Sequence, residues 1–390
     1  MATAAEETGN RPTTRHNVVW VREALQRAIE LEHATLPVYT AAMLSLEVQN
    51  YTSYNSVRSV LMEEMVHMSI AANMLAAIGG RPRIRDLAPA YPARGLPGGV
   101  EPDLHLGLTQ LSKAQLRNFM RLESPYFLLP EEYRRESYPT IGRLYAEIRD
   151  AVVENAAELR AAVNGGHVAN QVGDNIGFTT IVPASGVDPV DQLLAGIDEI
   201  LEQGEGASAG SLHTGADYQH EESHYAKFAE LYYGRTFRAP QPPLALTKDS
   251  EAVWFQGDRI DWPAVVNTLA VPADGYEALL SEDKDGVAVA EELTVFDQVY
   301  TEMLQHLDEL WNGSSDPMTQ WATFGEAVEK MSKLRVTSCF TFMRREVPAD
   351  LVADLPRIYP TEYGHLRAYT DLDRPVFYGP RFRNLAAPRP

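Results

Sequence analysis

The sequence is poor in cysteine and in long apolar runs. Cys339 is its only cysteine, which excludes an intrachain disulfide network and a zinc cluster built from cysteines. The chain has no run of about 18 apolar residues of the kind that crosses a membrane, and residues 1–16 lack the apolar core of a targeting peptide. From these absences we expect a cytoplasmic protein without a membrane partner, in which residues 1–16 form a disordered lead.

Basic residues are also scarce relative to acidic ones. The chain has 34 Lys and Arg against 54 Asp and Glu, a net charge of -20 and a pI near 4.9. Such a surface repels nucleic acid and anionic membranes, so neither is expected as a partner. The sequence contains no GxGxxG loop, no Walker-type loop and no supported Ser/His/Asp arrangement. With 390 residues, 45% of them hydrophobic, it can bury a sizeable core in one or two domains.

Two Glu-x-x-His pairs stand out among the residues that are present. Glu64/His67 and Glu221/His224 each lie in a stretch with helical apolar periodicity. Side chains three residues apart share one face of a helix, and the apolar stripes direct both pairs toward a core. A buried carboxylate costs several kcal/mol unless a partner or a metal compensates it. One such pair is commonly a solvated helix face, but two matched pairs favour a bundle core that holds two metal ions.

A third inward-facing acid precedes the first pair. Glu32 lies at the centre of an apolar helical stripe, whereas Glu30 and His33 fall toward its flanks. The chain is expected to turn near residues 49–53, so that Glu32 and Glu64 meet at one level on antiparallel helices. Glu32 is therefore predicted to be a ligand.

A carboxylate-bridged dimetal site normally takes four acids and two histidines, so one more acid is needed. Candidates are Glu147 and Glu154 in one predicted helix, and Glu202 and Glu205 at the end of another. Glu147 borders an apolar stripe, and Glu202 lies just before the turn toward the second pair. The two are favoured about equally. The predicted metal ligands are Glu32, Glu64, His67, Glu147, Glu202, Glu221 and His224.

Several stretches carry a family resemblance. QRAIELEHATLPVYTAAMLSL at 26–46 and EEMVHMSIAANMLAAIGGRP at 63–82 resemble the ferritin-like domain of the iminophenyl-pyruvate dimer synthases of violacein and rebeccamycin assembly. FMRLESPY, YPTIGRLYAEI, IDEILEQGEG and ESHYAKF extend the likeness to about Gly234, and residues 288–345 are similar to the second half of longer members. The resemblance implies oxidative chemistry on an amino-acid-derived or aromatic small molecule. Arg143 stands where an acid is expected in this family.

The expected fold is all-α. We predict a ferritin-like helical bundle at 17–234 with long irregular insertions, an irregular connector at 235–285, and a helical pair with a tail at 286–390 packed on the bundle. Residues 79–108 are dense in Pro and Gly and are expected to be irregular. Residues 165–188 are expected to form a short strand pair or a lid.

Two irons held by carboxylates and imidazoles can activate dioxygen or peroxide without haem or flavin, provided that open positions face a dry pocket. We therefore expect an oxidase or oxygenase of secondary metabolism, with imine coupling as the variant implied by the family. Arg143 is predicted to lie near the site, as a nearby charge or a clamp for a substrate carboxylate, and Tyr225 to act in catalysis. The sequence leaves three alternatives open: manganese as the metal in place of iron, an electron donor as a partner, and assembly as a homodimer. The aromatic residues predicted to line the pocket are Tyr39, Tyr126, Phe127, Tyr218 and Tyr225.

Two other functional classes would use the same predicted metal ligands. An inactive scaffold or a small-molecule-binding protein would retain the bundle without the chemistry, and Arg143 favours this alternative. Iron storage is disfavoured, because a storage shell consists of short identical subunits, whereas this chain has long Pro- and Gly-rich insertions.

Overall fold

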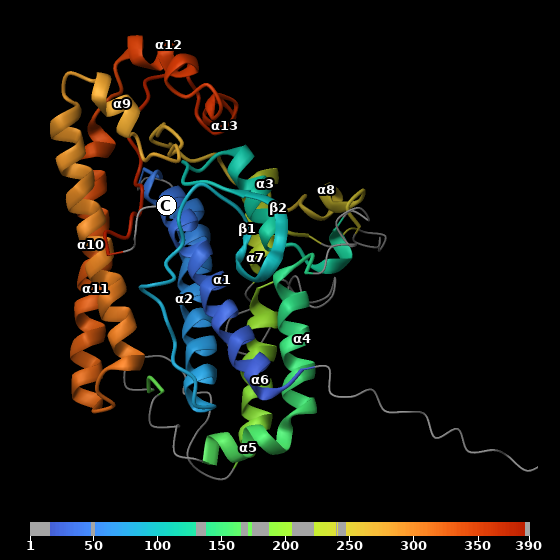
Figure 1. Cartoon of the computed structure of the whole chain (residues 1–390). Helices are drawn as coiled ribbons and strands as arrows, with labels where there is room; N and C mark the ends of the chain where they lie inside the picture. The colour runs from blue at the N-terminus through green and yellow to red at the C-terminus, as the bar shows by residue number, and fades with distance from the viewer. Residues whose placement is uncertain are drawn as a thin grey trace, which may run out of the picture.

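The computed structural model describes residues 16–47, 51–129, 138–164, 171–173, 187–204, 222–238, 240 and 247–386. Its centre is a long antiparallel hairpin of α1 (Val18–Leu44) and α2 (Tyr51–Ala77) (Figure 1). The side chain of Asn17 begins α1 by accepting a hydrogen bond from the backbone N–H of Trp20. Residues 28–39 of α1 are buried on every face. A helix with this burial must be covered on both sides.

One side of the hairpin is covered by shorter helices arranged in two columns. Each column is interrupted, because it consists of an upper and a lower helix instead of one long helix. The helices are α3 (Lys113–Leu122), α4 (Ile141–Glu154), α5 (Ala156–Asn164), α6 (Pro189–Gln203) and α7 (His224–Tyr233). In Figure 1, α3 packs against α7 beside the upper part of the hairpin, and α4 packs against α6 beside the lower part. The interruptions, between α3 and α4 and between α6 and α7, therefore fall at the middle of the hairpin.

The other side of the hairpin is covered by a second antiparallel pair, α10 (Gly286–Asn312) and α11 (Pro317–Cys339) (Figure 1). The tail of the chain returns along this pair, where Arg381 forms a buried ion pair with Asp297 of α10 at 2.7 Å. Shorter helices complete the described part: α8 (Glu251–Trp254), α9 (Glu277–Glu282), α12 (Ala349–Ile358) and α13 (Tyr363–Tyr369). Turns of 3-10 helix lie at Pro97–Gly99, Tyr126–Leu128 and Phe342–Arg344.

A short β-hairpin lies where the sequence predicts irregular structure. β1 (Ala93–Leu96) pairs with β2 (Val100–Leu106) in antiparallel register, with Ala93 opposite Leu106. Gly98 and Gly99 adopt φ of 79° and 77°, values that favour glycine and permit a tight reversal. The prediction for 79–108 is wrong here, because these glycines shape a hairpin turn. The strand pair or lid predicted at 165–188 lies largely outside the described residues.

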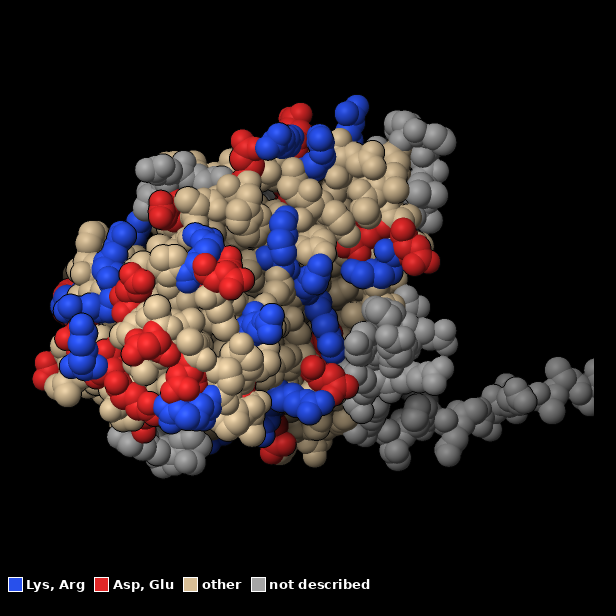
Figure 2. Space-filling view, turned by 90° about the horizontal axis from the view of Figure 1, so that it is seen from above, with Lys and Arg blue, Asp and Glu red and all other residues tan. Residues whose placement is uncertain are grey.

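The helical architecture confirms the predicted all-α class and bundle. None of the described helices combines the length and apolarity that a membrane span requires. The connector at 235–285 contains only α8 and α9 as helices in its described part. The end of the molecule seen in Figure 2 carries basic and acidic side chains interspersed, so the net negative charge of the chain does not cover that face continuously.

Candidate metal centre

The predicted ligands from three helices converge at the interruptions of the helical columns. Glu32 lies in the middle of α1, and Glu64 and His67 lie in the middle of α2. His224 is the first residue of α7, preceded by the capping residue Ser223. All four ligand side chains are buried. The shared helix face predicted for a Glu-x-x-His pair is present for Glu64 and His67 on α2. It is wrong for the second pair, because α7 begins at His224, after Ser223 in a non-helical conformation, and Glu221 lies outside the described residues.

The cluster divides into two groups that share one carboxylate. Glu32, Glu64 and His67 offer ligand atoms that all lie within 4.8 Å of one another, and so do Glu64, Glu123 and His224. The two imidazole rings lie side by side, with centroids 5.4 Å apart. A carboxylate that belongs to both groups is the arrangement that a bridged pair of metal ions requires.

Glu123 is the acid that the sequence analysis did not select. It caps the C-terminus of α3 and is 2% exposed. The negative end of the helix dipole disfavours a carboxylate at this position, so an acid directly after an apolar helical stripe was a usable signal. The stretch FMRLESPY at 119–126 carries part of the family resemblance, but the resemblance does not single out Glu123 as a ligand. Together with Glu32 and Glu64, Glu123 makes a third acid of the cluster among the described residues.

The acids predicted for that role lie elsewhere. Glu147 projects from α4 toward His16, whose Nε2 lies 2.7 Å from its Oε1. Glu202 is exposed to solvent. The next residue, Gln203, points inward instead, because one residue turns a helix by about 100°. The prediction of Glu147 assumes a modest rotation of its helix, and that of Glu202 rests on its place just before the turn toward the second pair. In the structure, neither side chain belongs to the cluster. Glu205 and Glu221 lie outside the described residues.

Both histidines are held so that one ring nitrogen faces the acids. Nε2 of His224 lies 2.7 Å from Oε2 of Glu63, which in turn binds Nζ of Lys227 at 3.0 Å. Nε2 of His67 lies 3.0 Å from Oε1 of Gln203. The inward Nδ1 of His224 lies 2.7 Å from Oε1 of Glu64, yet it has no aligned hydrogen-bond partner. An outer partner that fixes an inward nitrogen is typical of metal-binding histidines.

Hydroxyl groups lie against the three carboxylates. Tyr39 donates a hydrogen bond to Glu123, and Tyr145 donates one to Oε1 of Glu32 at 2.5 Å. The hydroxyl of Thr35 lies 3.3 Å from Oε2 of Glu64 and 2.8 Å from the backbone carbonyl of Glu32, which is its shorter hydrogen bond. Glu32 and Glu123 are therefore each oriented by a buried neutral donor, and these hydroxyls bring no positive charge.

The electrostatics of the cluster favour a bound cation. Burial, followed by the charge of Glu64, raises the pKa of both Glu32 and Glu123. Burial would also raise the pKa of Glu64, but its contact with His224 lowers it to about 2. Burial opposes charge on His224, yet Glu123, Glu63 and Glu64 raise its pKa well above the ordinary value.

Among the described residues, no Lys or Arg pairs with Glu32, Glu64 or Glu123. A group of three buried acids, balanced only by imidazoles, fits divalent metal ions, which would replace the protons that these side chains otherwise hold. Nδ1 of His224, which lies 2.7 Å from Glu64 and 3.5 Å from Glu123, could serve as a nitrogen ligand at the same place.

The two residues predicted to act in catalysis are not directed at this cluster. Arg143 is exposed, and its guanidinium lies over the ring of Tyr126, 5.4 Å from the centroid. Tyr225 is buried, and burial followed by the charge of Glu251 raises its pKa. The tyrosines that contact the acids are Tyr39 and Tyr145.

The predicted aromatic pocket is also not formed as expected. Tyr39 is a buried partner of Glu123, Tyr126 is 40% exposed, and Tyr218 lies outside the described residues. A small cavity of the size that one water molecule needs adjoins the acids. It is lined by the start of α4 and the end of α6, including Ile141 and Ile200.

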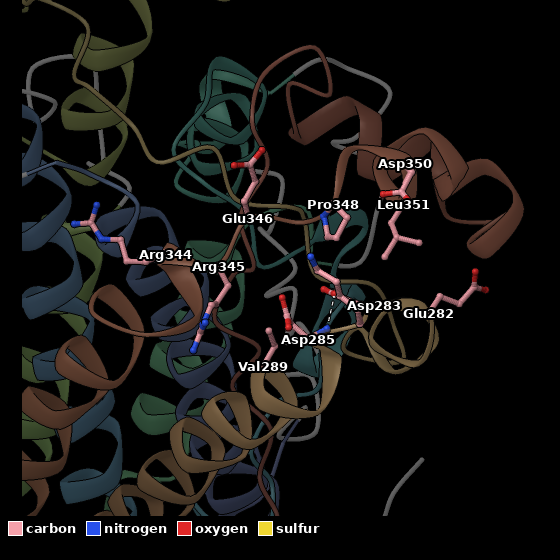
Figure 3. Close-up of a pocket in the computed structure, with 11 residues that line it drawn as sticks. Glu282, Asp283, Asp285, Val289, Arg344, Arg345, Glu346, Pro348, Asp350 and Leu351 are labelled. Carbon is pink, nitrogen blue, oxygen red and sulfur yellow. Dashed lines mark hydrogen bonds between the residues drawn. The ribbon is translucent and has the colours of Figure 1, made fainter.

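A pocket at another end of the molecule differs from the metal centre in character (Figure 3). It lies between the start of α10 and the segment after α11, and acids and arginines both line it. Arg345 is paired with Glu292 at 2.6 Å, and Asp283 accepts a hydrogen bond from the backbone N–H of Asp285. Asp285 and Asp350 are exposed. Charges that are paired or solvated in this way mark an ordinary surface hollow.

Comparison with known proteins agrees with this geometry. A model of the Ferritin-like family matches residues 25–233, a range that contains every member of the cluster. A solved structure of a ferritin-like protein from Caulobacter vibrioides shares the fold, with a TM-score of 0.55 and 20% sequence identity over 83% of this chain and 94% of that chain. No curated protein matches the sequence. The family match spans more than half of the 390 residues, and the chain therefore belongs to the ferritin-like family.

Proposed function

We propose that the protein is a non-haem dimetal oxidoreductase. The observation that carries the proposal is the position of Glu64, which belongs at once to the Glu32/His67 group and to the Glu123/His224 group. A carboxylate shared between two ligand sets is what a dimetal centre requires. Iron storage would use the same ligands and is disfavoured by the long Pro- and Gly-rich insertions of this chain. Glu221, three residues before His224 in the sequence, is proposed as the acid that completes the second set, because carboxylate-bridged dimetal centres normally take four acids.

The donor set favours iron. It consists of carboxylate oxygens and imidazole nitrogens without a thiolate, and such ligands suit iron and, as the alternative, manganese. Two iron ions bound here would supply the electrons for reducing dioxygen or peroxide.

The side chains around the acids are proposed to position the ligands. Tyr145 and Tyr39 hold Glu32 and Glu123, so neither acid is free to rotate away. Lys227 fixes Glu63, and Glu63 fixes the ring of His224. Such outer contacts commonly change metal affinity by about 10- to 100-fold.

Apolar side chains are proposed to keep bulk water away from the centre. Ile141, Ile200 and Leu201 line the small cavity beside the acids. A dry, low-dielectric site strengthens the electrostatic interactions within it and protects reactive species from hydrolysis. Dioxygen is small and apolar enough to enter such a space.

The proposed substrate is an amino-acid-derived or aromatic small molecule of secondary metabolism, with oxidative imine coupling as the family-implied reaction. This finer assignment is supported by the sequence likeness at 26–46 and 63–82, which surrounds Glu32, Glu64 and His67. The alternative is an inactive scaffold, which would bind metal with the same ligands but would not turn over a substrate.

The test compares metal content and oxygen uptake in three proteins: the natural chain, Glu64→Gln and Glu147→Gln. We expect about two iron ions per chain in the natural protein, by analogy with the two ligand groups. Glu64→Gln should lose both ions, whereas Glu147→Gln, whose carboxylate binds His16, should keep both. Oxygen uptake with an aromatic 2-keto acid and ammonium, which form the imine, should follow iron content. Iron binding without uptake for any such substrate would favour the scaffold, and full iron in Glu64→Gln would end the dimetal proposal.

A further inference from the structure

A second cavity lies on the opposite side of the central hairpin from the metal centre. It has a volume of about 510 Å³ and is enclosed by α1 and α2 on one side and by α10 and α11 on the other. Small-molecule sites typically occupy about 300 to 1,000 Å³. This cavity is therefore large enough for an organic ligand.

The wall of the cavity is apolar and adaptable. Six of the 11 methionines of the chain line it: Met43, Met62, Met65, Met68, Met303 and Met331. Methionine side chains are unbranched and polarizable, so they fit apolar ligands of varied shape. The buried polar groups in the wall are paired. His33 and Tyr300 hydrogen-bond each other at 3.2 Å. Ser69 donates to the backbone carbonyl of Val66 at 2.7 Å, and the indole N–H of Trp311 donates to Oδ1 of Asn73 at 2.8 Å.

The cavity is separate from the metal centre although it shares two helices with it. On α2, Leu61, Met65 and Met68 line the cavity, whereas Glu64 and His67 belong to the candidate metal centre. Since each residue turns a helix by about 100°, these sets occupy different faces. A ligand in this cavity need not contact the metal ligands.

The cavity is elongated along the bundle. On α11 its lining runs from Phe324 to Arg335, a distance of about 16 Å at the rise of an α-helix. On α10 it runs from Tyr300 to Trp311, about the same length. This shape suits an extended chain better than a compact ring system.

One end of the cavity presents two arginines without acidic partners. Arg335 lies over the ring of Tyr54, 5.7 Å from the centroid, and donates a hydrogen bond to its hydroxyl at 3.4 Å. Arg58, one turn after Tyr54 on α2, also lines the cavity and is exposed. Neither arginine forms an ion pair with a described residue, although the net charge of the chain is -20. Guanidinium groups are well suited to bind a carboxylate.

We propose that this cavity binds an elongated amphipathic carboxylate. The apolar chain lies among the methionines, and the carboxylate binds Arg58 and Arg335 at the open end. The site is independent of the dimetal function and requires no metal.

The first experiment measures binding of dodecanoate and of 1-dodecanol to the full-length protein by isothermal titration calorimetry, below the micelle concentration. We expect one dodecanoate per chain and at least tenfold weaker binding of the alcohol, because the alcohol has no charge for the arginines. The Arg58→Gln/Arg335→Gln variant should bind dodecanoate about tenfold more weakly. Lys333→Gln, which removes a charge from the exposed face of α11 where Lys333 pairs with Glu329, is the matched control and should bind as the natural protein does.

The second experiment tests the position of the chain. Val328, 40% exposed, lines the cavity from α11, and Val328→Trp should reduce binding of dodecanoate at least tenfold while circular dichroism stays unchanged. Equal affinity for acid and alcohol, or full affinity in the arginine variant, would overturn the proposal for the head group. Binding of phenylacetate as tightly as dodecanoate, or full affinity in Val328→Trp, would overturn the elongated site, and no binding of either probe would overturn both.

Discussion

Replacing Glu123 by glutamine separates the two halves of the proposed centre. Glu123 belongs only to the group that contains Glu64 and His224, and the Glu32/His67 group does not include it. Glutamine keeps the shape of the side chain and an oxygen that accepts the hydrogen bond of Tyr39. We therefore expect the variant to fold and to bind one metal ion per chain instead of two.

The structure also gives the size of the effect on stability. The ligand atoms of the Glu123 group lie within 4.8 Å of one another, and two full negative charges at about that distance repel by roughly 3.5 kcal/mol at an effective dielectric constant of about 20. The charge of His224 offsets part of this repulsion, and protonation of Glu123 offsets more, since its pKa is raised. We expect the metal-free variant to be more stable than the metal-free natural protein by about 1 kcal/mol.

The assay is urea unfolding with and without a chelator, combined with plasma mass spectrometry of the loaded proteins. Glu147→Gln is the control, because its carboxylate binds His16 outside the cluster. The reasoning is refuted if Glu123→Gln retains two ions, or if the metal-free variant is less stable than the natural protein by more than about 1 kcal/mol, a loss that an unimportant surface change does not produce.

Three further predictions follow from other contacts. Glu63→Gln should lower metal affinity about 10- to 100-fold, measured by chelator competition, because Glu63 orients His224; unchanged affinity would contradict that role. Metal binding should release protons, and affinity should rise with pH, because the pKa of His224 is raised in the chain without a cation; calorimetry in buffers of different ionisation enthalpy measures the release. Arg381→Met should destabilise the fold by about 3 kcal/mol at pH 8, because it leaves Asp297 buried and unpaired. Burial raises the pKa of Asp297 to about 6, so the loss should be smaller at pH 5, where the acid is neutral, and an equal loss at both pH values would contradict this explanation.

The helices that carry clear apolar periodicity could be predicted from the sequence. The helical pair predicted within 286–390 is present as α10 and α11. The β-hairpin at 93–106 could not be predicted, because Gly98 and Gly99 indicate a turn without indicating what flanks it. The short helices α12 and α13 were missed because their stability depends on packing against the rest of the chain.

Glu64 and His67 could be predicted because they share one helix, and His224 was identified from its motif although it begins α7, whereas Glu123 and Gln203 could not be predicted. Glu64 and His67 have a fixed spacing on α2, so their common face follows from helix geometry alone. Glu123 and Gln203 lie at the ends of α3 and α6, where orientation depends on how the interrupted columns meet. Glu202 and Gln203 are neighbours in the sequence, and only Gln203 points toward His67. Apolar periodicity does not predict, at a helix terminus, which of two neighbouring residues points inward.

The shared centre has a consequence for the unfolded chain. The protein has one cysteine and therefore no covalent link between distant parts of its sequence. A pair of ions held by Glu32, Glu64, Glu123 and His224 would connect α1, α2, the end of α3 and the start of α7. The loop between Glu123 and His224 is about 100 residues long. A cross-link that closes such a loop lowers the entropy of the unfolded chain and so raises the free energy of unfolding by roughly 4 to 5 kcal/mol in the loop-entropy account. The metal ions would then act as a reversible cross-link, which a chelator removes as a reductant cleaves a disulfide.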